Sequence, residues 1–181
     1  MRIVSGTAGG RKLVVPDGDS TRPTSERVRE AIFNSLYSLD AIDDADVLDL
    51  FAGSGALGLE ALSRGAARAT FVESDRDALE AIRDNVEILG FDSESRVVPG
   101  EALGYLGRAE GHDLVLLDPP YGFDDWDTLV NAIGEALAGA VVVIESDREV
   151  ATPDSWEIHR VKRYGSTVVM LATAGASVGG K

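Results

Sequence analysis

Five short apolar segments recur along the chain, and their spacing constrains the fold more than any other feature. They span residues 46–51, 68–73, 96–99, 113–118 and 140–145, and each has the length and content of a buried strand. The segments between them are long enough for crossover helices. This alternation predicts an α/β fold in which a mainly parallel sheet carries helices on both faces.

Two helices and two hairpins are predicted around this core. The clearest helix covers residues 75–89, where Asp75 can cap the N-terminus and Gly90 can end the helix. Its apolar stripe comprises Leu79, Ile82, Val86 and Leu89. An earlier helix is predicted over residues 24–39, with an inward face made of Val28, Ile32, Phe33, Leu36 and Leu39.

Paired apolar segments at both ends of the chain predict hairpins. Residues 2–5 and 11–15 flank a glycine-rich stretch, which indicates a small hairpin with a flexible tip. Residues 156–163 and 166–173 flank Tyr164 and Gly165 and predict a second hairpin near the end of the chain.

The size and composition of the chain favour one domain over its 181 residues. We expect a hairpin and helix over residues 1–40, a catalytic core over 41–174 and a flexible tail over 175–181. Cysteine is absent and there are only two histidines, so no metal site is expected. The chain lacks an apolar run of membrane-spanning length and a secretory signal, which predicts a soluble, cytoplasmic protein, and we expect a monomer.

A glycine-rich segment follows the first sheet strand. Gly53, Gly55 and Gly58 have the G-x-G-x-x-G spacing, and Glu73 stands at the end of the next strand, where a carboxylate can bind ribose hydroxyls. Asp49, just before this loop, would repel a pyrophosphate but would attract the sulfonium and ammonium groups of S-adenosylmethionine. The pattern therefore favours S-adenosylmethionine over a nicotinamide cofactor, although the glycines could simply tighten a strand-helix turn.

The sequence Asp118-Pro119-Pro120-Tyr121 directly follows the fourth apolar segment. The carboxylate of Asp118 and the carbonyl of Pro119 could accept hydrogen bonds from an exocyclic amine, and Tyr121 could stack on the ring that carries it. Pro120 would stiffen the turn. A simpler reading is a turn with Tyr121 as a plug over the core. If the first and fourth strands are neighbours, both motifs meet at one edge of the sheet, which favours methyl transfer to an amine on a base.

The charge of the chain is unevenly distributed. The net charge is −14 and the pI is about 4.4, which argues against a protein whose surface is broadly basic for binding nucleic acid. Residues 1–29 nevertheless carry +3, so the remainder carries −17. A second small basic cluster near the C-terminus consists of Arg160, Lys162 and Arg163.

The glycine loop and residues 118–121 resemble class I amino-group methyltransferases. Segments 2–6, 10–13, 22–24 and 27–34 look like the start of the RsmD family of 16S ribosomal RNA guanine-N2 methyltransferases, and the likeness extends through residues 163–165. The resemblance implies a Rossmann-like sheet of seven strands with an antiparallel last strand. It also implies that the partner is 16S ribosomal RNA within an assembled or partly assembled small subunit.

The resemblance also assigns residues to roles. S-adenosylmethionine would be held by Asp49, Phe51, Ala52, Gly53, Gly55, Glu73, Ser74, Glu101 and Ala102. The catalytic residues that hold the guanine would be Asp118, Pro119 and Tyr121. RNA phosphates would meet Arg11, Lys12, Arg22, Arg27 and Arg29.

Three other functions stay open at this point. The motif at residues 118–121 also suits methylation of adenine N6 in DNA. The glycine loop also suits a nicotinamide-dependent oxidoreductase. A non-catalytic role in RNA binding or subunit assembly would use the basic N-terminal segment alone.

Overall fold

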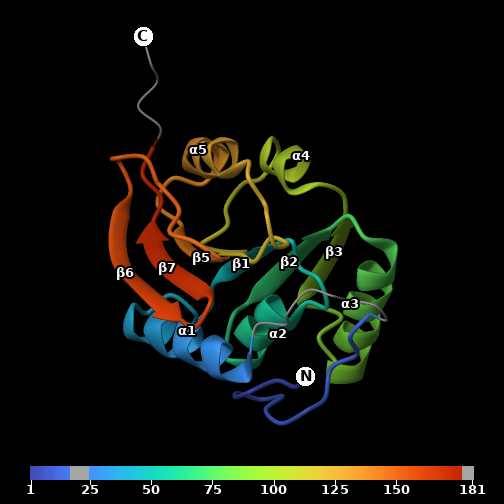
Figure 1. Ribbon diagram of the computed structural model, residues 1–181. Helices are drawn as coiled ribbons and strands as arrows, with labels where there is room; N and C mark the ends of the chain where they lie inside the picture. The colour runs from blue at the N-terminus through green and yellow to red at the C-terminus, as the bar shows by residue number, and fades with distance from the viewer. Residues whose placement is uncertain (17–24, 177–181) are drawn as a thin grey trace.

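A seven-stranded sheet forms the centre of the computed structural model, which describes residues 1–16 and 25–176 (Figure 1). The predictions for Arg22 and for most of the tail lie outside these residues. The strands are β1 Asp46–Leu50, β2 Arg68–Glu73, β3 Ser95–Pro99, β4 Leu114–Leu117, β5 Val141–Ser146, β6 Glu157–Tyr164 and β7 Thr167–Thr173. Their order across the sheet is β3-β2-β1-β4-β5-β7-β6.

The first five strands are parallel, whereas β7 runs antiparallel to both β5 and β6. This confirms the predicted fold of a mainly parallel sheet with an antiparallel end. It also confirms the predicted terminal hairpin. Because β7 reverses direction, the end of β6 and the start of β7 lie at the same edge as the carboxyl ends of the parallel strands.

Helices cover both faces of the sheet (Figure 1). They are α1 Glu26–Ser38, α2 Ala56–Ser63, α3 Arg76–Leu89, α4 Ala102–Leu106 and α5 Trp126–Ala136. Strand β4 shows why the sheet needs both layers, because Leu114 and Leu116 belong to the core beneath α1 to α3, while Val115 and Leu117 belong to the core beneath α4 and α5. None of the described helices has the length and apolar content needed to cross a membrane.

The predicted caps set the boundaries of α3. The side chain of Asp75 accepts a hydrogen bond from the backbone NH of Ala78 at 2.8 Å, and Gly90 ends the helix with a φ of 74°. Its four predicted apolar residues are buried. Helix α1 is capped by Ser25 and ends at Ser38. Leu39 follows the helix and is 38% exposed, so its predicted inward orientation is wrong.

The N-terminal hairpin is fastened to α2. Its two arms are joined by a bridge between Arg2 and Lys12. The backbone NH of Thr7 donates to the Ser63 carbonyl at 2.7 Å, and the NH of Ala8 donates to Ser63 Oγ at 2.9 Å. Gly6 has a φ of 84°, and a Cβ there would lie 1.8 Å from the Ser63 carbonyl oxygen. The prediction of a flexible tip is therefore wrong, because close packing on α2 holds the glycine turn in place.

Candidate active site

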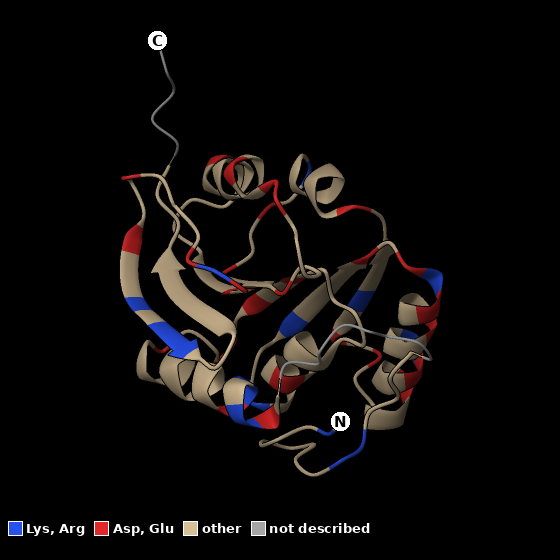
Figure 2. Ribbon diagram, in the orientation of Figure 1, with Lys and Arg blue, Asp and Glu red and all other residues tan. Residues whose placement is uncertain are grey.

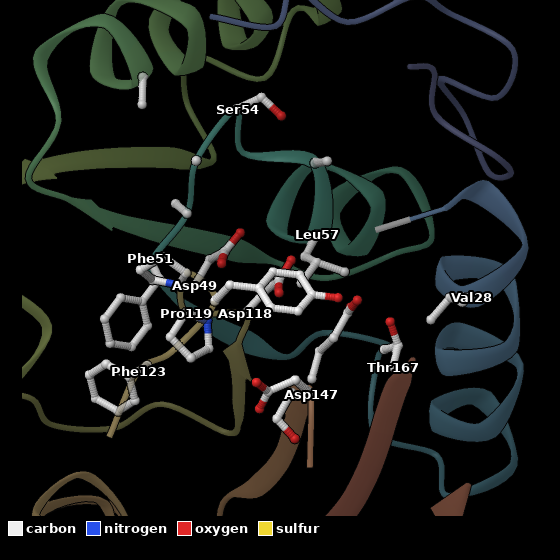
Figure 3. A pocket seen from close by; sticks show the side chains of 18 of the residues that line it. Val28, Asp49, Phe51, Ser54, Leu57, Asp118, Pro119, Phe123, Asp147 and Thr167 are labelled. Atoms are coloured by element: carbon white, nitrogen blue, oxygen red, sulfur yellow. The ribbon is translucent and has the colours of Figure 1, made fainter. Parts of the chain in front are cut away.

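A cavity of about 1060 Å³ lies at the carboxyl ends of the parallel strands (Figure 3). Strands β1 and β4 are direct neighbours, with Leu50 paired to Leu117. This pairing brings the loop after β1 and the turn after β4 together at one edge of the sheet. The first and fourth strands are therefore neighbours, which is the condition under which the two motifs were predicted to meet. The predicted cofactor-binding and catalytic residues that line the cavity are Asp49, Phe51, Ala52, Gly53, Glu73, Ser74, Glu101, Asp118, Pro119 and Tyr121.

The loop after β1 is shaped by left-handed backbone conformations. Phe51 has a φ of 63°, unusual for a residue with a side chain, and Gly53 has a φ of 55°. Gly58 allows close packing, because a Cβ there would lie 2.4 Å from the ring of Phe71. The backbone NH of Gly58 donates a hydrogen bond to the carboxylate of Asp49 at 2.9 Å.

Glu73 fixes the two loops that border the cavity. Its Oε2 accepts a hydrogen bond from the NH of Gly53 at 2.8 Å. Its Oε1 accepts from the NH groups of Ser74 and Asp75 at 2.8 and 2.9 Å. One carboxylate thus holds the glycine loop and the start of the α3 cap together at the cavity wall.

Asp49 is a strongly perturbed acid in the cavity. Its side chain is buried, and burial raises the pKa of this carboxyl from 3.8 to about 8, with the negative charges of Asp118 and Glu73 adding to the rise. The hydrogen bond from Gly58 acts in the opposite direction. Three carboxyl groups therefore converge where a cation would relieve both the burial of charge and the mutual repulsion. The sulfonium and ammonium groups of S-adenosylmethionine fit this arrangement, and a pyrophosphate does not.

The turn after β4 forms the wall next to the glycine loop. Pro119 is buried, while Tyr121 is 60% exposed and its hydroxyl lies 3.4 Å from Ser166 Oγ in the β6–β7 turn. Phe123 packs edge-on against Phe51, with ring centroids 5.3 Å apart. The wall therefore joins an aromatic contact with the glycine loop to an exposed tyrosine ring on which a base could stack.

Two predicted cofactor residues do not line the cavity. Gly55 precedes α2 with a φ of 80°, and a Cβ there would press against Leu59 at 3.3 Å. Ala102 is buried in the core beneath α4.

The predicted RNA-contacting residues are dispersed. Arg27 lines the cavity at the start of α1. Arg11 and Lys12 are exposed on the N-terminal hairpin outside the cavity lining, and Arg11 donates a hydrogen bond to the Ile88 carbonyl of α3.

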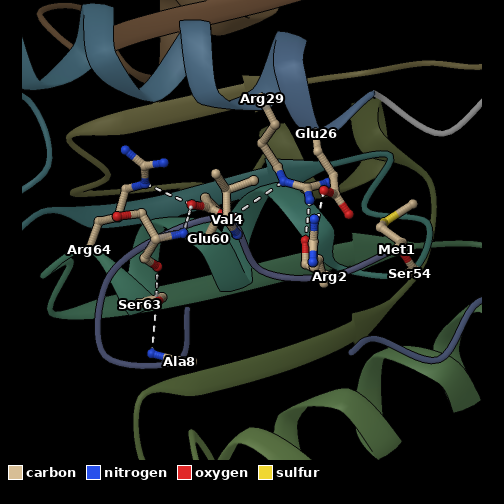
Figure 4. Close-up of polar contacts among 12 residues, drawn as sticks. Met1, Arg2, Val4, Ala8, Glu26, Arg29, Ser54, Glu60, Ser63 and Arg64 are labelled. Carbon is tan, nitrogen blue, oxygen red and sulfur yellow. Dashed lines mark hydrogen bonds and ion pairs between the residues drawn. The ribbon is translucent and has the colours of Figure 1, made fainter. Parts of the chain in front are cut away.

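Arg29 is inside the protein, so its prediction as an RNA contact is wrong. It is fully buried, and its Nε lies 3.4 Å from Glu60 (Figure 4). Burial lowers the pKa of Arg29, and the charge of Glu60 opposes this effect. Glu60 also accepts hydrogen bonds from the backbone NH groups of Val4 and Ser5 at 2.8 and 3.1 Å and from Arg64 Nε at 2.7 Å. This Arg29–Glu60–Arg64 network ties α1, α2 and the N-terminal hairpin together.

Sequence reasoning missed part of the cavity lining. The ends of β5 and β6 contribute Glu145, Ser146, Asp147, Lys162, Arg163 and Tyr164. The basic pair in β6 was visible as a charge cluster, but only the strand order brings it to the edge that carries the two motifs.

The chain matches known proteins over nearly its full length. The family model described as Conserved hypothetical protein 95 matches residues 1–173. Ribosomal RNA small subunit methyltransferase D of Escherichia coli K12 is 40% identical over 178 residues, covering 94% of this chain and 88% of the relative. The putative rRNA methyltransferase YlbH of Bacillus subtilis is 36% identical, with 94% and 97% covered.

A solved structure of a similar protein shows the same fold. The putative methyltransferase yhhF from Escherichia coli has a TM-score of 0.86 and 38% identity, with 98% of this chain and 99% of that chain covered. The fold is therefore that of class I methyltransferases. The chain belongs to the Conserved hypothetical protein 95 family, which is the RsmD family.

Proposed function

We propose that this protein transfers a methyl group from S-adenosylmethionine to the exocyclic N2 amine of a guanine in 16S ribosomal RNA. The observation that carries the proposal is the shared cavity, in which the glycine loop with Asp49 faces the Asp118-Pro119-Pro120-Tyr121 turn. The protein would act in the cytoplasm, as a monomer, on an assembled or partly assembled small subunit.

The methyl donor is assigned from the charge of the cavity. Asp49 would attract the cationic part of S-adenosylmethionine, and Glu73, already held by three backbone NH groups, has acceptor capacity left for ribose hydroxyls. Phe51, Ala52, Ser74 and Glu101 would complete the binding site along the same wall. When bound, the cofactor supplies an electrophilic methyl group.

The chemistry of the substrate side follows from Asp118 and Pro119. An exocyclic amine is a weak nucleophile because its lone pair is delocalised into the ring. Hydrogen bonds from the amine to the Asp118 carboxylate and the Pro119 carbonyl would favour a tetrahedral nitrogen and offset its developing positive charge. A nitrogen–carbon bond forms as the sulfur–carbon bond breaks, the thioether product leaves, and the nitrogen loses one proton to solvent.

The RNA substrate is assigned from the relatives. The Escherichia coli relative is named for the RNA of the small ribosomal subunit, and the Bacillus subtilis relative is named as a putative rRNA methyltransferase. The choice of guanine N2 comes from the resemblance of the whole chain to the RsmD family and from the amine-binding chemistry of residues 118–121. A base already outside a helical stack would suit the site, because stacking on Tyr121 alone offsets only about 1 to 3 kcal/mol of an extrusion cost of a few kcal/mol.

The test compares substrates. Small subunits, naked 16S RNA and DNA from cells that lack this enzyme are incubated with labelled S-adenosylmethionine, and the modified nucleotide is mapped. We expect incorporation into the RNA as N2-methylguanine, with the assembled subunit as the better substrate. Labelled N6-methyladenine in DNA would instead support the DNA enzyme. Binding of NAD without binding of S-adenosylmethionine would support the oxidoreductase. Full cellular function of Asp118→Ala would support a non-catalytic role.

A further inference from the structure

Three cations from distant parts of the sequence meet at one side of the cavity. Arg27 lies at the start of α1, and Lys162 and Arg163 lie at the end of β6. All three are exposed and line the cavity. Figure 2 shows basic residues at both places, the end of β6 and the start of α1.

The end of β6 is fixed relative to the rest of the site. Arg160 Nη1 donates to Ser35 Oγ of α1 at 2.8 Å, which joins the strand to the helix. Lys162 Nζ lies 5.2 Å from the centroid of the Tyr164 ring, which packs against the core. Ser166, in the turn after β6, contacts the hydroxyl of Tyr121 at 3.4 Å. The basic strand end is therefore held beside the ring proposed to stack on the substrate base.

The rest of the cavity has the opposite charge. The acidic lining residues are Asp49, Asp75, Asp77, Glu73, Glu101, Asp118, Glu145 and Asp147. These carboxylates suit a cationic methyl donor and repel a phosphate. A nucleotide whose base enters this cavity must therefore keep its phosphates near the three cations, where the sign of the charge is favourable.

The three cations are available to bind an anion. Several other arginines are held in ion pairs, including Arg2 with Glu26 and Arg148 with Asp124. Across residues 1–16 and 25–176, no carboxylate forms an ion pair with Arg27, Lys162 or Arg163. Binding of a phosphate at these positions would therefore break no ion pair within this part of the chain.

We propose that Lys162 and Arg163, together with Arg27, bind the backbone phosphates of single-stranded RNA on either side of the methylated nucleotide. The proposal rests on the proposed function and gives it a second RNA contact, formed by the β6–β7 hairpin in addition to the N-terminal segment. Single-stranded RNA is the fitting partner because its unstacked bases can leave the strand, while its phosphates stay accessible.

The test uses the full chain with Lys162→Gln and Arg163→Gln combined, which removes two charges and keeps side chains of similar polarity. The matched control combines Arg83→Gln and Arg96→Gln, two exposed residues outside the cavity lining. Methyl transfer is measured against RNA concentration at several salt concentrations, and cofactor affinity by calorimetry. We expect the apparent KM for RNA to rise several-fold in K162Q/R163Q alone. The slope of log affinity against log salt should become shallower by about 0.7 per lost phosphate contact, or about 1.4 for both. Cofactor affinity should stay unchanged.

Other outcomes would contradict either the phosphate contact or the proposed function. An unchanged KM and salt slope in a correctly folded, active K162Q/R163Q protein would overturn the phosphate contact. The same loss in the control pair would show an effect of net charge alone and would overturn it as well. A lower kcat with unchanged KM and slope would assign these residues another role. No methyl transfer to RNA by the wild-type protein would instead reject the proposed function itself.

Discussion

Proton release on cofactor binding is the sharpest consequence of the buried Asp49 carboxyl. The pKa of this group is raised to about 8 in the free protein. At pH 7 the group is therefore about 0.9 protonated, by the ordinary titration relation. A cation bound beside Asp49 favours the carboxylate, so S-adenosylmethionine should displace nearly all of this proton. The ratio of the wild-type association constant to that of Asp49→Asn should rise almost tenfold per pH unit near pH 7 and level off above about pH 9, because this ratio removes the titration of the cofactor's own amino group.

Calorimetry in two buffers of different ionisation enthalpy measures this directly, because the difference in observed heat gives the number of protons released. We expect the wild type to release about 0.9 proton per cofactor more than Asp49→Asn at pH 7, and nearly the same number as Asp49→Asn at pH 9. The Asp49→Asn variant serves as the control, since it reports any protons exchanged by the amino group of the cofactor itself. Equal proton release by the wild type and the variant at pH 7 would refute the role of Asp49.

Three substitutions test other parts of the structure. Asp118→Ala should lower kcat at least tenfold, since a hydrogen bond to a charged group is worth about 1.5 to 3 kcal/mol. Calorimetry should find that the variant still binds the cofactor. Near-normal turnover would contradict the proposed role of Asp118. Glu60→Gln should lower the free energy of unfolding in urea by about 3 to 5 kcal/mol, because it leaves the buried Arg29 without its ion-pair partner. The control Glu80→Gln removes an exposed ion pair and should change stability by less than about 1 kcal/mol. Equal effects of the two substitutions would rule out this account. Gly6→Ala should lower the melting temperature in a thermal scan, because its φ of 84° and the 1.8 Å approach to the Ser63 carbonyl leave no room for a methyl group; an unchanged melting temperature would show that the turn rearranges freely.

The sequence predicted the parts of the fold that depend on local pattern. The α3 boundaries follow from Asp75 and Gly90, and those residues act within one turn of the positions they control. The strands β1, β2, β4 and β5 follow from runs of apolar residues, which stay buried whichever neighbour they pair with. The two motifs at strand ends came together because the strand order β1-β4 is typical of this fold.

The errors arose where the outcome depends on tertiary packing. The charge of Arg29 is evident in the sequence, but its burial depends on Glu60, which lies in another helix. The glycine-rich hairpin tip reads as flexible until Ser63 is brought against it. In each case the deciding partner is distant in sequence.

The hairpin of β6 and β7 at one border of the sheet separates substitutions that alter the cavity rim from substitutions that alter the buried strands. Because β7 is antiparallel, the two-residue turn of Gly165 and Ser166 between β6 and β7 lies at the edge of the sheet that carries the cavity. Strand β6 is the border strand, and its residues are almost all exposed. Substitutions or insertions there would alter the rim of the cavity without disturbing the buried strands that shape the proposed methyl-donor site. Substrate preference could therefore diverge among relatives along this border while the cofactor half of the protein is retained.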